Sequence, residues 1–132
     1  MSTHTRRWWL ALPMLGWAAD APAELFVIET EGFAFIPNAV EILVGDTVQW
    51  NLAVAHHNVV QTTGPDTCNR MFDGFMSGAT ESDTSQPVYS RVFDASGTYY
   101  YKCNTHCASG MRGRITVVAP SDIFADGFES AD

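Results

Sequence analysis

Residues 99–111 read YYYKCNTHCASGM, and this stretch carries three side chains that bind soft metal ions. They are the thiol of Cys103, the imidazole of His106 and the thioether of Met111, at C-x2-H-x4-M spacing. The stretch follows an aromatic-rich strand pattern and precedes a β-branched run, so we expect it to form a loop between two strands. His57 begins another β-branched run far upstream, and we expect folding to bring it to the loop as a fourth ligand.

This set of donors discriminates between metals. Magnesium and calcium prefer oxygen, whereas a His2Cys set with a weak axial Met is typical of copper used in electron transfer. We therefore predict one copper ion per chain, cycling between Cu(I) and Cu(II). The alternative is a closed structural zinc site, which would use His57, Cys103, His106 and Cys107.

Residues 1–23 have the organisation of a secretory signal peptide. A basic pair at 6–7 precedes an apolar run over 8–19 and a small-x-small pattern at 21–23. The apolar run is shorter than the roughly 20 residues that a membrane-spanning helix needs. We expect a mature chain that starts at Glu24, has no membrane span and is periplasmic or secreted.

The three cysteines can be assigned on the basis of export, because disulfides persist outside the cytoplasm. If Cys103 binds the metal, Cys68 and Cys107 remain as a pair. Their bridge would close a loop of 40 residues, counted from 68 to 107. The chain-entropy model values such a bridge at about 4 kcal/mol. In the alternative, Cys107 is the ligand and Cys103 is a structural thiol, which fits the strand pattern less well.

Composition limits the size of the protein and the kind of partner. The 132 residues, 46% of them hydrophobic, have room for one domain with a real core. The formal charge is −8, and removal of residues 1–23 takes away two Arg and one Asp, which leaves −9. An acidic surface disfavours nucleic acid and anionic membranes. It suits a soluble monomer that meets a redox partner with a basic docking face.

Short segments with alternating hydrophobicity, separated by Gly, Pro, Asn and Asp, predict an all-β domain over residues 24–120. The strand candidates are 25–30, 39–44, 47–52, 57–62, 88–93, 99–103 and 114–118. The Gly45-Asp46 turn between the second and third predicts a hairpin with one buried face. Such a series of strands favours a sandwich or small barrel of two sheets. Residues 121–132 read as an acidic tail outside the domain.

Alternation also orients the strand candidate over residues 99–103. If Cys103 faces the interior, Tyr99 and Tyr101 face inward with it. Tyr100 and Lys102 then point outward, so we expect the Lys102 ammonium in water.

Four motifs together resemble the cupredoxins, and especially their plastocyanin-like bacterial members. The motifs are GDTV at 45–48, HNVV at 57–60, GTYYYKCNTH at 97–106 and GMRG at 110–113. The resemblance implies a Greek-key β-sandwich of about seven or eight strands with type 1 copper at one end. The implied ligands are His57, Cys103, His106 and Met111, with His56 as a neighbour.

The resemblance also implies roles around the metal. Asn58 would tie the two ligand segments together by a side-chain hydrogen bond. The Cys68 and Cys107 positions look like the phytocyanin branch, where such cysteines form a disulfide beside the copper. His106 would be the exposed ligand through which the electron leaves, and His57 would be more buried. Plastocyanins of photosynthetic organisms carry an outward Tyr where this chain has Lys102, which argues against a second electron-entry route there.

Function follows from these residues. The chain shows no paired-carboxylate or nucleophile motif, so we expect no enzymatic activity. We predict a one-electron carrier. The alternative is a copper-binding module for delivery or storage, but residues 24–132 contain only three Met and three His, and Cu(I) carriers tend to be richer in both.

Overall fold

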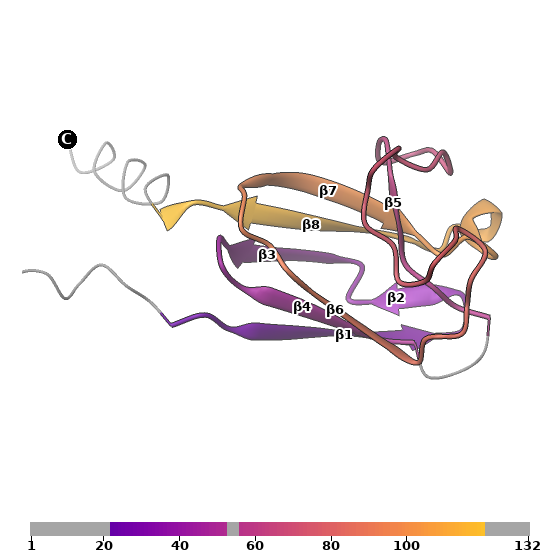
Figure 1. Cartoon of the computed structure of the whole chain (residues 1–132), viewed down its shortest axis with the longest axis horizontal. Helices are drawn as coiled ribbons and strands as arrows, with labels where there is room; N and C mark the ends of the chain where they lie inside the picture. Colours follow the sequence, from indigo (N-terminus) through magenta and orange to yellow (C-terminus); the bar gives the residue numbers. More distant parts are fainter. Residues whose placement is uncertain (1–21, 53–55, 121–132) are drawn as a thin grey trace, which may run out of the picture.

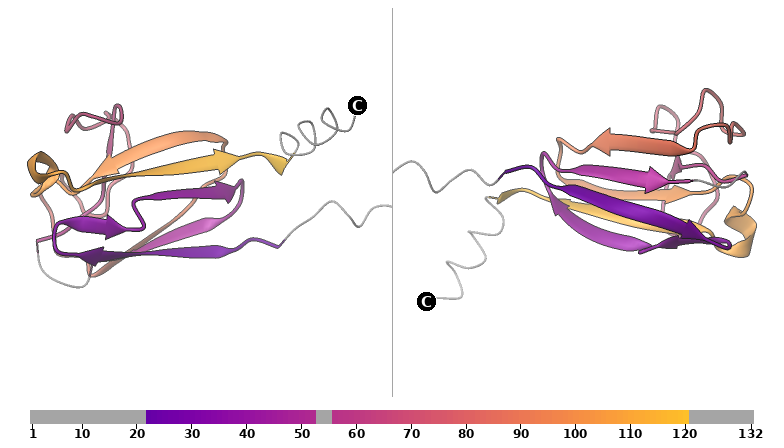
Figure 2. Two further views of the ribbon diagram at one scale, coloured as in Figure 1. Left: turned by 180° about the vertical axis from the view of Figure 1, so that it is seen from behind. Right: turned by 90° about the horizontal axis from the view of Figure 1, so that it is seen from below.

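The computed structural model describes residues 22–52 and 56–120, which form eight strands and one short 3-10 turn. The elements are β1 (Leu25–Glu31), β2 (Ala34–Ile36), β3 (Ala39–Leu43), β4 (Thr47–Asn51), β5 (Val60–Thr62), β6 (Val88–Val92), β7 (Gly97–Lys102), η2 (Cys107–Ser109) and β8 (Arg112–Val118). One sheet has the order β2-β1-β4-β6 and the other β3-β8-β7-β5. The two sheets face each other as the layers of a sandwich (Figures 1 and 2), which confirms the predicted all-β fold. The predicted signal peptide, apart from its last two residues, and the acidic tail lie outside the described residues.

The core lies between the sheets and is rich in aromatic rings. In β4 the alternating residues Val48 and Trp50 are both fully buried. The Trp50 ring meets the edge of Tyr101 at 5.3 Å and stacks with Tyr89 at 5.5 Å. Edge-to-face and offset-stacked pairs add stability beyond the area that they bury. This packing gives β7, the strand that ends directly before Cys103, a rigid support.

Residues 39–52 do not form the hairpin that their alternation predicted. β3 pairs in parallel with β8, whereas β4 pairs in parallel with β1 and antiparallel with β6, so the two strands belong to different sheets. The turn between them carries the chain across the sandwich. In this turn the Asp46 carboxylate accepts hydrogen bonds from the backbone N–H groups of Leu43 and Glu24, both at 2.9 Å. Alternation shows which side of a strand is buried, but not which strand lies next to it.

The strand expected over residues 57–62 is shorter than predicted. Only Val60–Thr62 forms β5, which is an edge strand and pairs antiparallel with β7. The segment that follows folds back over this edge. Gln61 donates to the Phe75 carbonyl at 2.8 Å and accepts from the Met71 backbone N–H at 2.9 Å. The free edge is therefore covered, and the covering segment lies at the same end of the sandwich as η2 (Figure 1).

The prediction that Lys102 lies in water is wrong. Its side chain leaves the sandwich core on the outer side of β7, but only 3% of the residue is exposed. The segment between β5 and β6 covers it, and the ammonium lies 2.5 Å from the Cys68 carbonyl and 2.6 Å from Glu81 Oε2. Alternation predicted the side of the strand correctly, and an irregular layer with no periodic signal buries that side.

The described chain begins and ends at the end of the sandwich opposite to η2 (Figure 1). Among the described residues, no helix is long and apolar enough to cross a lipid bilayer.

Candidate metal centre

Three of the predicted ligands meet at one end of the sandwich. The ligand atoms of His57, Cys103 and His106 all lie within 4.8 Å of one another. The thiol of Cys103 is 3.8 Å from Nδ1 of His57 and 3.6 Å from Nδ1 of His106. Pairing of β5 with β7 explains the approach of His57, because Val60 lies opposite Lys102 and so brings residues 57 and 103 to the same end.

These distances fit a metal ion bound by all three side chains. Bonds of about 2.3 Å to sulfur and about 2.0 Å to nitrogen, at an angle of about 120°, place the two atoms about 3.7 Å apart. The observed separations of 3.6 and 3.8 Å lie on either side of that value. One thiolate and two imidazoles in such an arrangement suit copper.

Backbone hydrogen bonds hold Met111 beside the other three residues. The Cys103 N–H donates to the Met111 carbonyl at 3.0 Å, and the Met111 N–H donates to the His106 carbonyl at 3.2 Å. Met111 is fully buried. The turn between His106 and Met111 closes at Gly110, which has φ of 96° and therefore lies in the left-handed region that favours glycine. All four predicted ligands thus lie at this end, and their direct coordination of a metal stays our prediction.

Burial and neighbouring imidazoles shift the pKa of His57 in the direction that favours metal binding. Burial lowers the pKa of His57 below its ordinary value, the nearby His106 and His56 rings lower it further, and a hydrogen bond to the Gly32 backbone opposes the shift. Desolvation disfavours the charged imidazolium. The lowered pKa favours the neutral ring, which has a nitrogen lone pair available to a metal.

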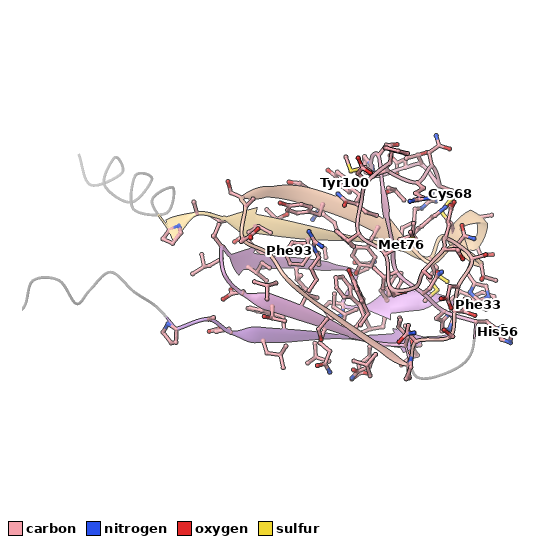
Figure 3. The ribbon with its side chains drawn as sticks, in the orientation of Figure 1. Phe33, His56, Cys68, Met76, Phe93 and Tyr100 are labelled. Atoms are coloured by element: carbon pink, nitrogen blue, oxygen red, sulfur yellow. A yellow bond between two sulfur atoms is a disulfide. The ribbon has the colours of Figure 1, made fainter. Side chains whose placement is uncertain are left out.

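His106 is the ligand candidate that reaches the surface. It is partly exposed, whereas His57 is only 8% exposed and Cys103 is fully buried. The ring of Phe33 stacks on His106 with centroids 4.1 Å apart and an interplanar angle of 16°. Phe33 is itself 58% exposed and lies at the same end of the molecule as His56 (Figure 3). Sequence reasoning missed Phe33, because no spacing relates it to a ligand 73 positions away.

His56 differs from its neighbour His57 in backbone and in surroundings. It has φ of 81°, an uncommon value for a residue other than glycine, and its side chain is exposed. Its carbonyl oxygen lies 3.7 Å from the Cys103 sulfur. His56 does not belong to the ligand cluster, in line with its predicted place as a neighbour.

Asn58 makes the hydrogen bond that the resemblance implied. Its Oδ1 accepts from the Asn104 backbone N–H at 2.8 Å and so joins the segment of His57 to the loop of Cys103 and His106. Its amide nitrogen also donates to the carbonyls of Glu81 at 2.9 Å and Asp83 at 3.1 Å. The second pair of contacts was not predicted, because the 63–86 segment carries no periodic pattern.

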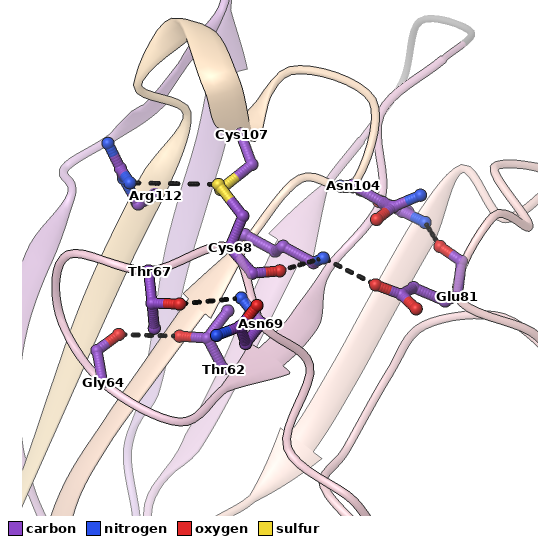
Figure 4. The surroundings of a disulfide bond; sticks show 11 residues. Thr62, Gly64, Thr67, Cys68, Asn69, Glu81, Asn104, Cys107 and Arg112 are labelled. Atoms are coloured by element: carbon purple, nitrogen blue, oxygen red, sulfur yellow. Dashed lines mark hydrogen bonds and ion pairs between the residues drawn. A yellow bond between two sulfur atoms is a disulfide. The ribbon is translucent and has the colours of Figure 1, made fainter.

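The predicted disulfide is present between Cys68 and Cys107, with Cα atoms 5.9 Å apart (Figure 4). Cys103 remains as the free cysteine. The pairing therefore confirms one reading of the three cysteines and excludes Cys107 as a metal ligand. The zinc alternative loses its fourth ligand for the same reason.

Comparison with known proteins gives one consistent result. A family described as "Copper binding proteins, plastocyanin/azurin family" matches residues 23–118. Plastocyanin of Vicia faba is 35% identical over 97 residues, which cover 65% of this chain and 89% of that protein. Amicyanin of Paracoccus versutus is 33% identical over 101 residues, which cover 76% of this chain and 70% of that protein. The crystal structure of pseudoazurin from Methylobacterium extorquens has the same fold, with a TM-score of 0.55 at 21% identity over 71% of this chain and 75% of that one.

Proposed function

This chain belongs to the plastocyanin/azurin family of copper-binding proteins, and from that premise we propose that it is an exported one-electron carrier with a single type 1 copper ion. Members of the family are generally electron carriers. The observation that supports the proposal most is the convergence of the Cys103 sulfur with Nδ1 of His57 and Nδ1 of His106, at 3.8 and 3.6 Å, in a largely buried site. Copper bound there would supply the Cu(I)/Cu(II) couple.

The protein's part in this function is to hold its donors still. Fast one-electron transfer needs ligands that barely move between the two oxidation states. Cys103 and Met111 are joined by a backbone hydrogen bond, and Asn58 links the loop to the strand that follows His57. Cys103 would hold the metal as its thiolate, so loading of the metal would release the thiol proton.

His106 is the proposed point at which the electron leaves and enters. Its ring is the most exposed of the four ligand candidates, and Phe33 lies flat against it. A partner that covers Phe33 would bring its own redox group close to this imidazole. The chain's formal charge of −8 favours a partner with a basic face. We propose a periplasmic or secreted monomer, on the basis of the signal-like residues 1–23.

The absorption spectrum of the copper-loaded protein tests this proposal. We expect an intense thiolate-to-copper band in the visible region that is bleached by one electron per chain and restored on oxidation. Cys103→Ser should abolish the band. Met111→Leu should shift it, whereas Met71→Leu, which alters a half-exposed Met outside the ligand set, should not. A colourless protein that holds zinc tightly would contradict the proposal.

Copper delivery is the competing function, and release of the metal separates the two. A carrier of electrons should keep its copper through many redox cycles in the presence of a Cu(I) chelator. A delivery module should lose it within a few cycles. Full burial of Cys103 and Met111 favours retention.

A further inference from the structure

Lys102 is a buried cation directly before the predicted copper ligand Cys103. Its side chain has 4% relative exposure, and its ammonium contacts Glu81 Oε2 at 2.6 Å and the Cys68 carbonyl at 2.5 Å. Glu81 is the more exposed partner, at 36%. The contacts run from the last residue of β7 to the segment that covers its outer side. Figure 4 shows Cys68 and Glu81, the two residues of that segment that Lys102 contacts.

A buried ion pair at this position is poorly explained by stability alone. Removal of a charged group from water costs several kcal/mol, and the attraction between the partners often only offsets this cost. A Lys on an outer strand face would ordinarily extend its ammonium into water. Here the ammonium is instead directed at two groups of one segment, which points to a positioning role.

That segment is attached next to every predicted ligand. We define the clamp segment as residues 68–83. Next to each predicted ligand in the sequence stands a residue that contacts the clamp segment. These residues are Asn58 beside His57, Lys102 beside Cys103, Cys107 beside His106, and Arg112 beside Met111.

Two residues of the clamp segment receive all four of these attachments, and Asn58 makes one further contact, with the Asp83 carbonyl. Cys68 forms the disulfide with Cys107, its carbonyl accepts from Lys102, and its sulfur lies 3.9 Å from the guanidinium of Arg112. Glu81 accepts from Lys102 through its carboxylate and from Asn58 through its carbonyl. Lys102 is the residue that joins Cys68 to Glu81, so it connects the two halves of the clamp segment at the point nearest to Cys103.

We propose that the clamp segment fixes the metal ligands in place before the metal binds, and that Lys102 is the positioning residue that closes it. The assignment of copper as the metal rests on the function proposed above. The clamp itself is a property of the metal-free protein. Residues that orient metal ligands without binding the metal themselves typically contribute 10–100-fold to metal affinity or activity.

Hydrogen exchange in the metal-free protein tests the clamp directly. The Asn104 N–H, held by Asn58 Oδ1 at 2.8 Å, reports on the ligand loop. The Phe93 N–H, which donates to the Asp46 carbonyl at 2.9 Å, reports on the opposite region of the sandwich (Figure 3). In Lys102→Met we expect exchange at Asn104 to accelerate about tenfold relative to Phe93. General destabilisation would accelerate both amides together.

Two further variants separate positioning from loss of stability. Tyr100→Leu alters the same face of β7 without touching the Lys102 contacts, so it should leave the Asn104-to-Phe93 ratio unchanged. Glu81→Ala removes a half-exposed partner of Lys102 and should reproduce the Lys102→Met ratio. The double variant should add little to the effect of Lys102→Met, because the Glu81 carboxylate acts on β7 through Lys102. Glu81→Ala also provides the test if Lys102→Met fails to fold.

The copper-loaded protein supplies a second readout. Lys102→Met and Glu81→Ala should release Cu(I) to a chelator about tenfold faster than the unmodified protein and Tyr100→Leu. An Asn104-to-Phe93 ratio that is the same in all variants would overturn the clamp, whatever the copper chemistry. Conversely, failure of the unmodified protein to form a type 1 site would overturn the proposed function and leave the exchange result valid.

Discussion

At the scale of single residues, Gly113 shows how tightly the strand before the metal centre is packed. Gly113 lies opposite Tyr101 in the β7–β8 register, and a Cβ at this position would overlap the Tyr101 ring. Tyr101 is fully buried, so its ring has no space to move into. We expect Gly113→Ala to lower the free energy of unfolding by about 1–3 kcal/mol or more.

Urea unfolding of the metal-free protein checks this expectation. Gly64→Ala is the matched control, because its added Cβ would meet only Thr67 Cγ2, at 3.9 Å. It should change the free energy of unfolding by less than about 0.5 kcal/mol. Equal stability of the two variants would mean that the Tyr101 ring is not held over Gly113.

Single residues also mark the limit of sequence reasoning about the site. The convergence of His57, Cys103 and His106 could be predicted because few residue types bind soft metals, and their order and spacing are specific. The stacking of Phe33 on His106 and the burial of Lys102 could not. Both depend on segments far apart in the chain that meet through irregular loops, for which residue type carries no signal.

At the scale of elements, the strands themselves were predictable and their partners were not. Alternation in β3 and β4 correctly predicted that each strand buries one face, which carries Ile42 in β3 and Val48 and Trp50 in β4. It failed on the pairing of these strands, because a short turn can join two strands of one sheet or cross between two sheets. The Asp46 side chain in this turn accepts hydrogen bonds from two backbone N–H groups, and these bonds favour the turn that crosses between the sheets.

The disulfide is the strongest element-scale constraint, and thiol counting verifies it. Unfolded protein that has not been reduced should show one free thiol, and Cys103→Ser should show none. Replacement of both Cys68 and Cys107 by Ala should lower the free energy of unfolding by about 2–4 kcal/mol, mainly because a 40-residue loop is no longer closed in the unfolded chain. Three thiols in the unmodified protein would rule the bridge out.

A carboxylate anchors the turn in which the clamp segment ends, and this makes the turn sensitive to acid. Hydrogen bonds from the Ser85 side chain and backbone, and from the Ala79 backbone, lower the pKa of Asp83 below its ordinary value. A carboxyl group whose pKa is lower in the folded state stabilises the fold above the pKa of the unfolded chain. That contribution is lost as the pH falls through the lowered folded-state value.

Thermal unfolding of the metal-free protein between about pH 5 and about pH 2.5 measures this contribution. The unmodified protein should be more stable than Asp83→Asn at the upper end, and the difference should shrink toward the lower end. A difference that stays constant over the range would show that ionisation of Asp83 does not anchor the turn.

At the scale of the whole molecule, net charge and the position of the metal centre together predict how fast the protein reacts with charged oxidants. The formal charge of −8 attracts cations, and the attraction is screened over about 10 Å at 0.1 M salt. Oxidation of the reduced copper protein by a cationic cobalt(III) complex should therefore slow as salt is added. Oxidation by ferricyanide, an anion, should accelerate.

Two glutamates distinguish local from overall charge in this reaction. Glu31 ends β1 directly before Gly32 and Phe33, which line a shallow pocket with His106, whereas Glu41 lines a pocket near the start of β1 at the other end. Glu31→Lys and Glu41→Lys change the net charge equally, and both side chains are exposed. If electrons pass through His106, Glu31→Lys should slow the cationic oxidant and accelerate the anionic one more than Glu41→Lys does, because Glu31 adjoins the pocket that His106 lines, and salt screens charges at the other end of the molecule more strongly. Equal effects of the two variants would place the exchange point elsewhere on the surface.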